Sequence, residues 1–169
     1  MQPSEEEFAE FFRASWGRLY RVALAVSGDA RSAEDDLQAA FAKVYASWGK
    51  VQRAEHPEAY VRRIVLNQVL GSRRYGFARH ERPHEAVGDT RSVASPESAV
   101  VDRDAVWAAV QTLPPRQRAV VVLRYYEDLS EAEIAEALGC SRGTVKSQAS
   151  SALATLRRTV GDLDLVEDR

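Results

Sequence analysis

Apolar residues recur at spacings of three and four along most of this chain, a pattern that indicates helices. No segment alternates apolar and polar residues for long enough to form a half-buried strand. In the first half, the spacing predicts helices over residues 5–27, 32–48 and 57–74, with Gly49 ending the second. The positions expected to face a core are Phe8, Phe11, Phe12, Leu19, Val22 and Val26, then Ala33, Leu37, Ala40, Phe41, Val44, Tyr45 and Trp48, and finally Tyr60, Ile64, Val65, Val69 and Leu70.

A polar stretch from about residue 76 interrupts this pattern. It is punctuated by Gly and Pro and has no sustained apolar period, so we expect a flexible linker. Helical spacing returns beyond it and pauses only at Pro114 and Pro115. The sequence therefore predicts an all-α fold of two small helical domains, with one domain over 1–75, the linker over 76–99, the second domain over 100–160 and a short acidic tail over 161–169.

Two short helices are predicted to meet abruptly after residue 129. Ser130 and Glu133 have the spacing of a capping box that starts the first helix, and Gly139 ends it in a turn that tolerates positive φ. Ser141 then caps the second helix. The inward positions are Ile134, Ala135 and Leu138 on the first helix and Val145, Ala149, Ala152 and Leu156 on the second. This is a helix-turn-helix pattern, a unit that can place its second helix in the major groove of DNA.

The second helix of this unit offers a polar face that suits DNA. No Asp or Glu occurs between Ser141 and Arg158, whereas a solvated helix usually mixes charges of both signs. The alternative is a pair of capped helices in an ordinary bundle that never contacts DNA. The candidate contact residues are Arg142, Thr144, Lys146, Ser147, Gln148, Ser150 and Ser151.

Charge and composition narrow the function classes. The 169-residue chain has a net charge of −2, but residues 56–84 carry six Arg against two Glu. The single cysteine, Cys140, excludes an internal disulfide. No apolar run approaches the roughly 20 residues of a membrane span, and the acidic start lacks a secretory signal. We therefore expect a cytoplasmic protein without membrane insertion.

Patterns for catalysis and metal binding are weak. The chain has no Gly-rich phosphate loop, no recognisable pair of catalytic carboxylates, and no Ser or Cys with a nearby His signature. We therefore expect neither an enzyme nor a cofactor. His80 and His84 lie four residues apart but lack further ligands, so no metal site is predicted.

Three segments of the chain carry a family resemblance. They are "LPPRQRAVVVLRYYEDLSEAEIAEALGCSRGTVKSQASSALATLR", residues 113–157, in the second half, and "AEDDLQAAFAKVYASW" and "HPEAYVRRIVLNQVLGSRR", residues 33–48 and 56–74, in the first half. The first segment resembles region 4, and the other two resemble region 2, of the sigma-70 family of RNA polymerase sigma factors, in its extracytoplasmic-function (ECF) group. The "GTVKSQ" motif and the Arg-rich, Lys-poor composition are most similar to actinobacterial, SigE-like members.

This resemblance implies a transcription initiation factor that binds bacterial core RNA polymerase, directs it to specific promoters and promotes strand opening. The partners that it implies are the beta-prime coiled coil and the beta flap of the polymerase, together with promoter DNA. An anti-sigma factor could cover the surfaces of both regions, although no residue identifies one.

The resemblance also implies roles for individual residues. Glu34, Asp35 and Gln38 match the face that docks on the beta-prime coiled coil. The helix from Ser141 matches the one that reads the minus-thirty-five element through the polar residues named above. The residues that match the minus-ten contacts are Arg62, Arg63, Asn67, Arg73 and Arg74, with Asn67 at the position that holds a flipped base. The chain departs from the usual family pattern at Asp36, Ala39, Gly71, Gln148 and Ser151.

Two other functions remain open from the sequence. A stand-alone helix-turn-helix transcriptional regulator would use the C-terminal helices in the same way, but it would not need "LNQVLGSRR" beside a polymerase-docking face. A helical adaptor that binds only proteins would not need an acid-free second helix.

Overall fold

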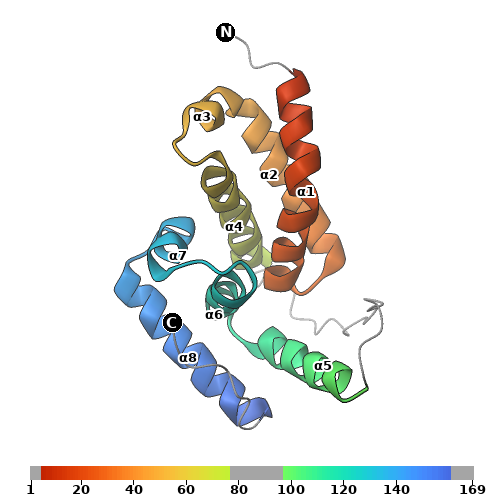
Figure 1. Ribbon diagram of the computed structural model, residues 1–169, viewed down its shortest axis with the longest axis vertical. Coiled ribbons are helices and arrows are strands. Elements are labelled where there is room, and N and C mark those ends of the chain that lie inside the picture. The colour runs from red at the N-terminus through yellow and green to blue at the C-terminus, as the bar shows by residue number, and fades with distance from the viewer. Residues whose placement is uncertain (1–4, 77–96, 161–169) are drawn as a thin grey trace.

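The computed structural model describes the backbone of residues 5–76 and 97–160 and the side chains of residues 5–72 and 103–160. All elements within these ranges are helical, which confirms the predicted all-α fold (Figure 1). The expected linker lies almost entirely outside the described residues, and so does the expected tail. The elements are α1 (Glu5–Ser27), α2 (Ala30–Ala46), α3 (Trp48–Arg53), α4 (Pro57–Gly76), α5 (Glu97–Thr112), α6 (Pro115–Val121), the π-helical segment η1 (Val122–Tyr126), α7 (Glu131–Leu138) and α8 (Arg142–Val160).

The end of the second helix differs from the prediction. The Asp29 carboxylate caps α2 by accepting a hydrogen bond from a backbone N–H of its first turn at 2.8 Å, and the helix ends at Ala46. Gly49 lies inside the short helix α3, so the prediction that it ends the second helix is wrong. The physical reason is Trp48, which is buried against Phe8 with 5.4 Å between the ring centroids. This aromatic contact fixes the start of α3, where the chain leaves the direction of α2.

The N-terminal half is a bundle of α1, α2 and α4 around an apolar core. Residues predicted to face this core are buried on all three helices, among them Leu19, Leu37 and Val65. Asp36 is also buried, and its carboxylate accepts hydrogen bonds from Gln68 at 3.1 Å and from Ser72 at 2.7 Å. Because both donors lie on α4, these bonds join α2 to α4 and satisfy an acidic side chain at an inward position.

Two tyrosines predicted to face the core lie at the surface instead. Tyr45 is 50% exposed and Tyr60 is 38% exposed. The Tyr45 ring packs edge-on against Phe8 with 4.9 Å between centroids, whereas Tyr60 lines an open hollow beside α4. The core prediction is wrong for both residues, because a tyrosine can pack its ring at the rim of a core while its hydroxyl stays in water.

The helix-turn-helix unit agrees with the prediction. Ser130 and Glu133 form both hydrogen bonds of the capping box, and Gly139 ends α7 with a φ of 63°. The hydroxyl and the backbone N–H of Ser130 lower the pKa of the Glu133 carboxyl. At the start of α8, the Ser141 hydroxyl accepts a hydrogen bond from the Thr144 N–H at 3.1 Å. The predicted inward positions are all buried: Ile134, Ala135, Leu138, Val145, Ala149, Ala152 and Leu156.

The two halves of the chain pack against each other. One apolar cluster runs from α1, α2 and α4 into α6, η1 and α7, so the halves share a core. A smaller cluster joins α5, α6 and α8. Figure 1 shows α6 and α7 between the N-terminal bundle and α8, which lies on the outer side of the C-terminal half.

Candidate polymerase- and nucleic-acid-binding surfaces

The predicted contact residues of α8 lie on its exposed side. The buried positions of this helix face α5, α6 and α7, so the polar positions between them face solvent. Lys146 also lies near α7, where its ammonium approaches the Glu131 carboxylate at 3.8 Å. Arg142, Lys146, Ser147, Ser150 and Ser151 are exposed, and Thr144 and Gln148 are half-buried.

Arg63 and Asn67 on α4 are exposed and lie close to the C-terminal half. Both line a hollow together with Tyr60, and Glu136 of α7 contributes to the same hollow. The Arg63 guanidinium also reaches the turn of the helix-turn-helix unit, where its Nη2 atom lies 3.7 Å from the position that a Cβ would take on Gly139. This face of α4 therefore borders α7 and the turn that follows it.

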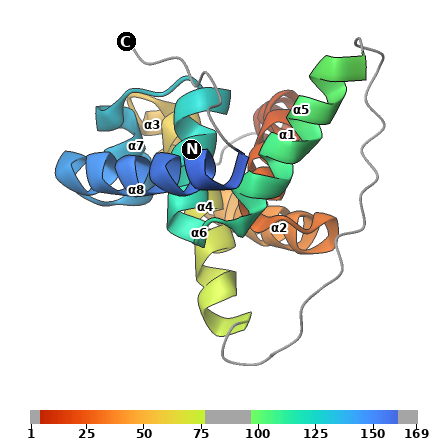
Figure 2. The same cartoon turned by 90° about the horizontal axis from the view of Figure 1, so that it is seen from below.

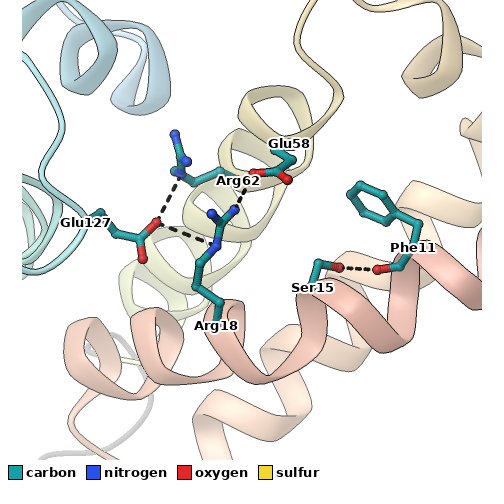
Figure 3. A network of polar contacts seen from close by, with 6 residues as sticks. All are labelled: Phe11, Ser15, Arg18, Glu58, Arg62 and Glu127. Carbon is teal, nitrogen blue, oxygen red and sulfur yellow. Dashed lines mark hydrogen bonds and ion pairs between the residues drawn. The ribbon is translucent and has the colours of Figure 1, made fainter.

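Arg62 differs from these neighbours because only 9% of its surface is exposed. Its Nε atom lies 3.6 Å from an oxygen of the Glu127 carboxylate, and the Nε atom of Arg18 lies 3.9 Å from the same oxygen (Figure 3). The Glu127 side chain is 4% exposed and belongs to the C-terminal half. Arg18 also pairs with Glu58 at 2.9 Å. The network thus ties α1 and α4 to the residue that follows η1.

A second set of polar contacts joins α1 to the C-terminal half. The buried Arg118 guanidinium donates hydrogen bonds to the carbonyl oxygens of Val26 at 3.0 Å, Gln111 at 2.7 Å and Leu113 at 3.0 Å. Arg21 of α1 donates from Nε to the Tyr126 hydroxyl at 2.7 Å. Since a helix leaves its last carbonyl groups without intrahelical donors, the Arg118 cation suits this end of α1.

The predicted polymerase-docking residues lie together on the outer face of α2. Glu34, Asp35 and Gln38 are exposed, and the Gln38 amide donates to the Glu34 carboxylate at 3.4 Å. Ala39 is half-buried, while Asp36 turns inward to α4. The face is therefore polar and acidic, and within the described residues Glu34, Asp35 and Gln38 form no hydrogen bond or ion pair with the C-terminal half.

The remaining candidate residues, and the candidate metal and membrane features, are as follows. Arg73 and Arg74 lie in the last turns of α4, which project beyond the other helices in Figure 2, and their side chains are outside the described part of the chain. His80 and His84 are also outside it. Within the described residues, no group of His, Cys, Asp or Glu suits a metal ion. None of the described helices combines the length and the apolar character that crossing a membrane requires.

Sequence reasoning missed the residues that connect the halves. Arg18, Arg118, Glu127 and Glu136 were not singled out, because their partners are distant in sequence. One signal was present for Arg62. It precedes Val65 and Leu66 by three and four residues, a spacing that puts it on the buried side of α4.

Comparison with known proteins identifies both halves. Residues 11–76 match the family model "Sigma-70 region 2", and residues 103–156 match "Sigma-70, region 4". The RNA polymerase sigma-E factor of Streptomyces antibioticus is 38% identical over 161 residues, which cover 94% of this chain and 87% of that protein. The ECF RNA polymerase sigma factor SigM of Mycobacterium tuberculosis is 33% identical over 157 residues, covering 93% of this chain and 79% of the relative.

The fold has a solved counterpart. The sigma factor RpoE of Bartonella quintana, in its co-crystal structure with the anti-sigma factor NepR, superimposes with a TM-score of 0.76 at 19% identity, covering 93% of this chain and 98% of that one. At this identity the match concerns the fold alone. The sequence matches, in contrast, cover both regions in the expected order and most of the chain. This protein therefore belongs to the ECF group of the sigma-70 family, and it is an alternative sigma factor that directs RNA polymerase to promoters.

Proposed function

We propose that the two halves of this sigma factor divide the work of promoter recognition. The N-terminal domain, residues 1–75, docks on core polymerase and captures the minus-ten element. The C-terminal domain, residues 100–160, binds the minus-thirty-five element as duplex DNA. Residues 76–99 form the linker that lets the domains span the two elements, and residues 161–169 are a short acidic tail.

The exposed face of α8 is the observation that supports upstream binding most strongly. Its side chains are accessible without any movement of α6 or α7, and the helix carries no acidic residue that would repel phosphates. Arg142 and Lys146 suit phosphates or guanine edges, and Gln148 can form two hydrogen bonds with an adenine edge. Ser147, Ser150, Ser151 and Thr144 add short hydroxyl donors on the same face.

Helix α4 carries the residues that bind the single strand. The Asn67 amide can both donate to and accept from the edge of a flipped base, and the hollow that it lines with Tyr60 offers an aromatic face beside it. Arg63 lies at the same hollow and can neutralise a phosphate. Arg62, Arg73 and Arg74 supply further cations along this helix.

Polymerase docking uses one surface on each half. Glu34, Asp35 and Gln38 form a polar, acidic patch that suits the beta-prime coiled coil. On α5, Trp107 is 45% exposed and lies with Val106 and Val110 on an apolar surface, the kind of surface that marks a protein contact. We assign this surface to the beta flap.

The protein is an initiation factor, and the chemistry of transcription belongs to the polymerase. The cytoplasm, where its polymerase partner acts, is its proposed compartment. Because the docking and promoter surfaces lie on both halves, an anti-sigma factor that covers both would silence it.

Binding to purified core polymerase tests the docking surface. The double charge reversal Glu34→Lys/Asp35→Lys is expected to weaken binding about tenfold or more, because it replaces an acidic patch with a basic one. Glu6→Lys is the matched control, since Glu6 is also exposed and lies at the opposite end of the α1–α2 pair. Equal affinity of wild type and the double variant, measured by fluorescence anisotropy, would contradict the assignment.

A further inference from the structure

Arg18 and Arg62 are arranged like the arginines of an anion-binding site, and the carboxylate of Glu127 takes the position of the anion. Both arginine Nε atoms approach the same carboxylate oxygen, at 3.9 Å and 3.6 Å. The carboxylate lies in the interface between the two halves, shielded from water. Two guanidinium groups that converge on one oxyanion are the usual protein arrangement for carboxylate or phosphate.

The carboxylate does not fill this site completely. Neither arginine lies within hydrogen-bond distance of Glu127, and the buried Arg62 Nε has no hydrogen-bond partner among the described residues. A buried donor without a partner is costly, and such an atom marks a place where another acceptor could bind. A phosphate group has more oxygens than a carboxylate and can accept from both arginines at once.

We propose that Arg18 and Arg62 form a phosphate-binding site for the promoter single strand, and that Glu127 occupies this site as an internal phosphate mimic when the two halves are docked. This proposal deepens the proposed function, on which it rests. Neither the family matches nor the sequence pattern assigns a role to Arg18 or to Glu127.

The surroundings of the site support this exchange. Arg63 and Asn67, the candidate single-strand contacts, lie one and five residues beyond Arg62 on the same helix. In the docked form, Glu136 shares their hollow and the Arg63 guanidinium rests near Gly139. The C-terminal half therefore places two acidic residues against α4: Glu127 beside the buried Arg62, and Glu136 in the exposed hollow of Arg63 and Asn67. Both would repel the phosphates of an approaching DNA strand.

Docking of the two halves on each other therefore competes with the binding of a DNA strand. A phosphate can reach Arg62 only after Glu127 has left, so the free protein binds single strands weakly. A partner that separates the halves, such as core polymerase spanning both domains, exposes the two arginines at the moment when the strand is to be captured. The apparent affinity for single-stranded DNA is then proportional to the fraction of molecules in which the two halves are separated.

A short oligo-dT strand tests the proposal without polymerase, because phosphate contacts do not depend on base sequence. Affinity is measured by fluorescence anisotropy over a range of salt concentrations for wild type, Glu127→Gln, Arg62→Ala and the double variant. We expect Glu127→Gln to raise affinity about fivefold or more. In the Glu127→Gln background, Arg62→Ala should remove most of this gain and lower the salt slope by about 0.7, the value for one phosphate contact on a single strand.

The wild-type background supplies the decisive comparison. There Arg62→Ala should change oligo-dT affinity by less than about twofold, because Glu127 already occupies the arginine. Glu10→Gln is the matched control: Glu10 is an exposed glutamate of α1 outside the contact between the halves, so its loss should leave affinity unchanged. An equal effect of Arg62→Ala in both backgrounds, or no gain from Glu127→Gln, overturns the proposal.

A second variant keeps the test valid if Glu127→Gln does not fold, as judged by circular dichroism. Tyr126→Phe removes only the hydroxyl that accepts from Arg21 and leaves all three residues of the site intact. Like Glu127→Gln, it should raise the affinity for oligo-dT, because it weakens the contact between the two halves. Unchanged affinity would then contradict the proposal. Transcription with core polymerase reports separately on sigma activity, so a negative oligo-dT result with normal transcription rejects only the phosphate site.

Discussion

The side-chain amide of Gln111 on α5 donates a hydrogen bond to the carbonyl oxygen of Ala25 on α1, 3.2 Å away. This bond and those of Arg118 satisfy carbonyl groups at the end of α1 with donors from the C-terminal half. The chain must leave the helix sharply at this point, and Gly28 does so with a φ of 75°. The end of α1 is thus shaped to receive the C-terminal half.

Gly28→Ala should therefore destabilise the protein. An alanine at this φ is strained, and its Cβ would overlap the Gln111 side-chain oxygen, so we expect a loss of about 1–2 kcal/mol in the free energy of unfolding. Gly71→Ala is the control, because a Cβ on this helical glycine meets nothing within 4 Å and should be neutral or stabilising. Urea denaturation measures both, and equal stabilities would show that the close approach to Gln111 is unimportant.

The capping box predicts a pH dependence. The Ser130 hydrogen bonds lower the pKa of Glu133, so this carboxylate stabilises the folded state above the pKa of an unfolded glutamate, near 4.3, and the contribution is lost as the pH falls through the lower folded pKa. Ser130→Ala should lose about 1 kcal/mol at pH 7, and its difference from wild type should shrink below about pH 4. Ser150→Ala, an exposed serine on α8, should lose no stability. A difference that stays constant from pH 7 to pH 3 would contradict this account.

The local features of the fold could be predicted because their signals lie within a few residues. Ser130 and Glu133 are three apart, and Gly139 directly follows α7, so spacing and residue type suffice. The contact between the halves could not be predicted in the same way. The spacing of Leu123 and Ile134 shows that these residues are buried, but it does not say that they share a cluster with α1 and α4.

The candidate site residues also fall into two groups, those that local signals or the family resemblance predict and those that depend on contacts between distant segments. Lys146 and Asn67 could be named from a local motif and from a family resemblance, and both prove to be exposed. The burial of Arg62 depends on Glu127, which approaches it only because α6 and η1 pack on α1. Asp36 is similar, since an acidic residue at an inward position makes sense only once Gln68 and Ser72 are seen on α4.

Asn67→Ala is expected to impair promoter opening while leaving polymerase binding intact. The alanine cannot hydrogen-bond the edge of a flipped base, but it lies on an exposed position of α4 and disturbs no buried contact. Permanganate reactivity of unpaired thymines measures opening, at protein concentrations below saturation. Gln52→Ala removes an exposed amide on α3 and serves as the control. Wild-type opening by Asn67→Ala would remove Asn67 from the minus-ten site.

Lys146→Ala should weaken binding to the upstream element. If Lys146 contacts a phosphate, its loss lowers the slope of log affinity against log salt concentration by about 0.9 on duplex DNA. Holoenzyme binding to duplex from a promoter that the protein transcribes provides the measurement. Lys50→Ala removes an exposed lysine of the N-terminal half and should leave the slope unchanged. An unchanged slope for Lys146→Ala would show that the lysine does not face a phosphate.

Run-off transcription from genomic fragments, with purified core polymerase and with or without this protein, tests the central assignment most directly. The assignment predicts discrete transcripts only when both components are present, together with stable association of the protein and core polymerase. The contrary result is a protein that never associates with core polymerase, adds no transcripts, and yet binds a specific DNA duplex tightly by itself.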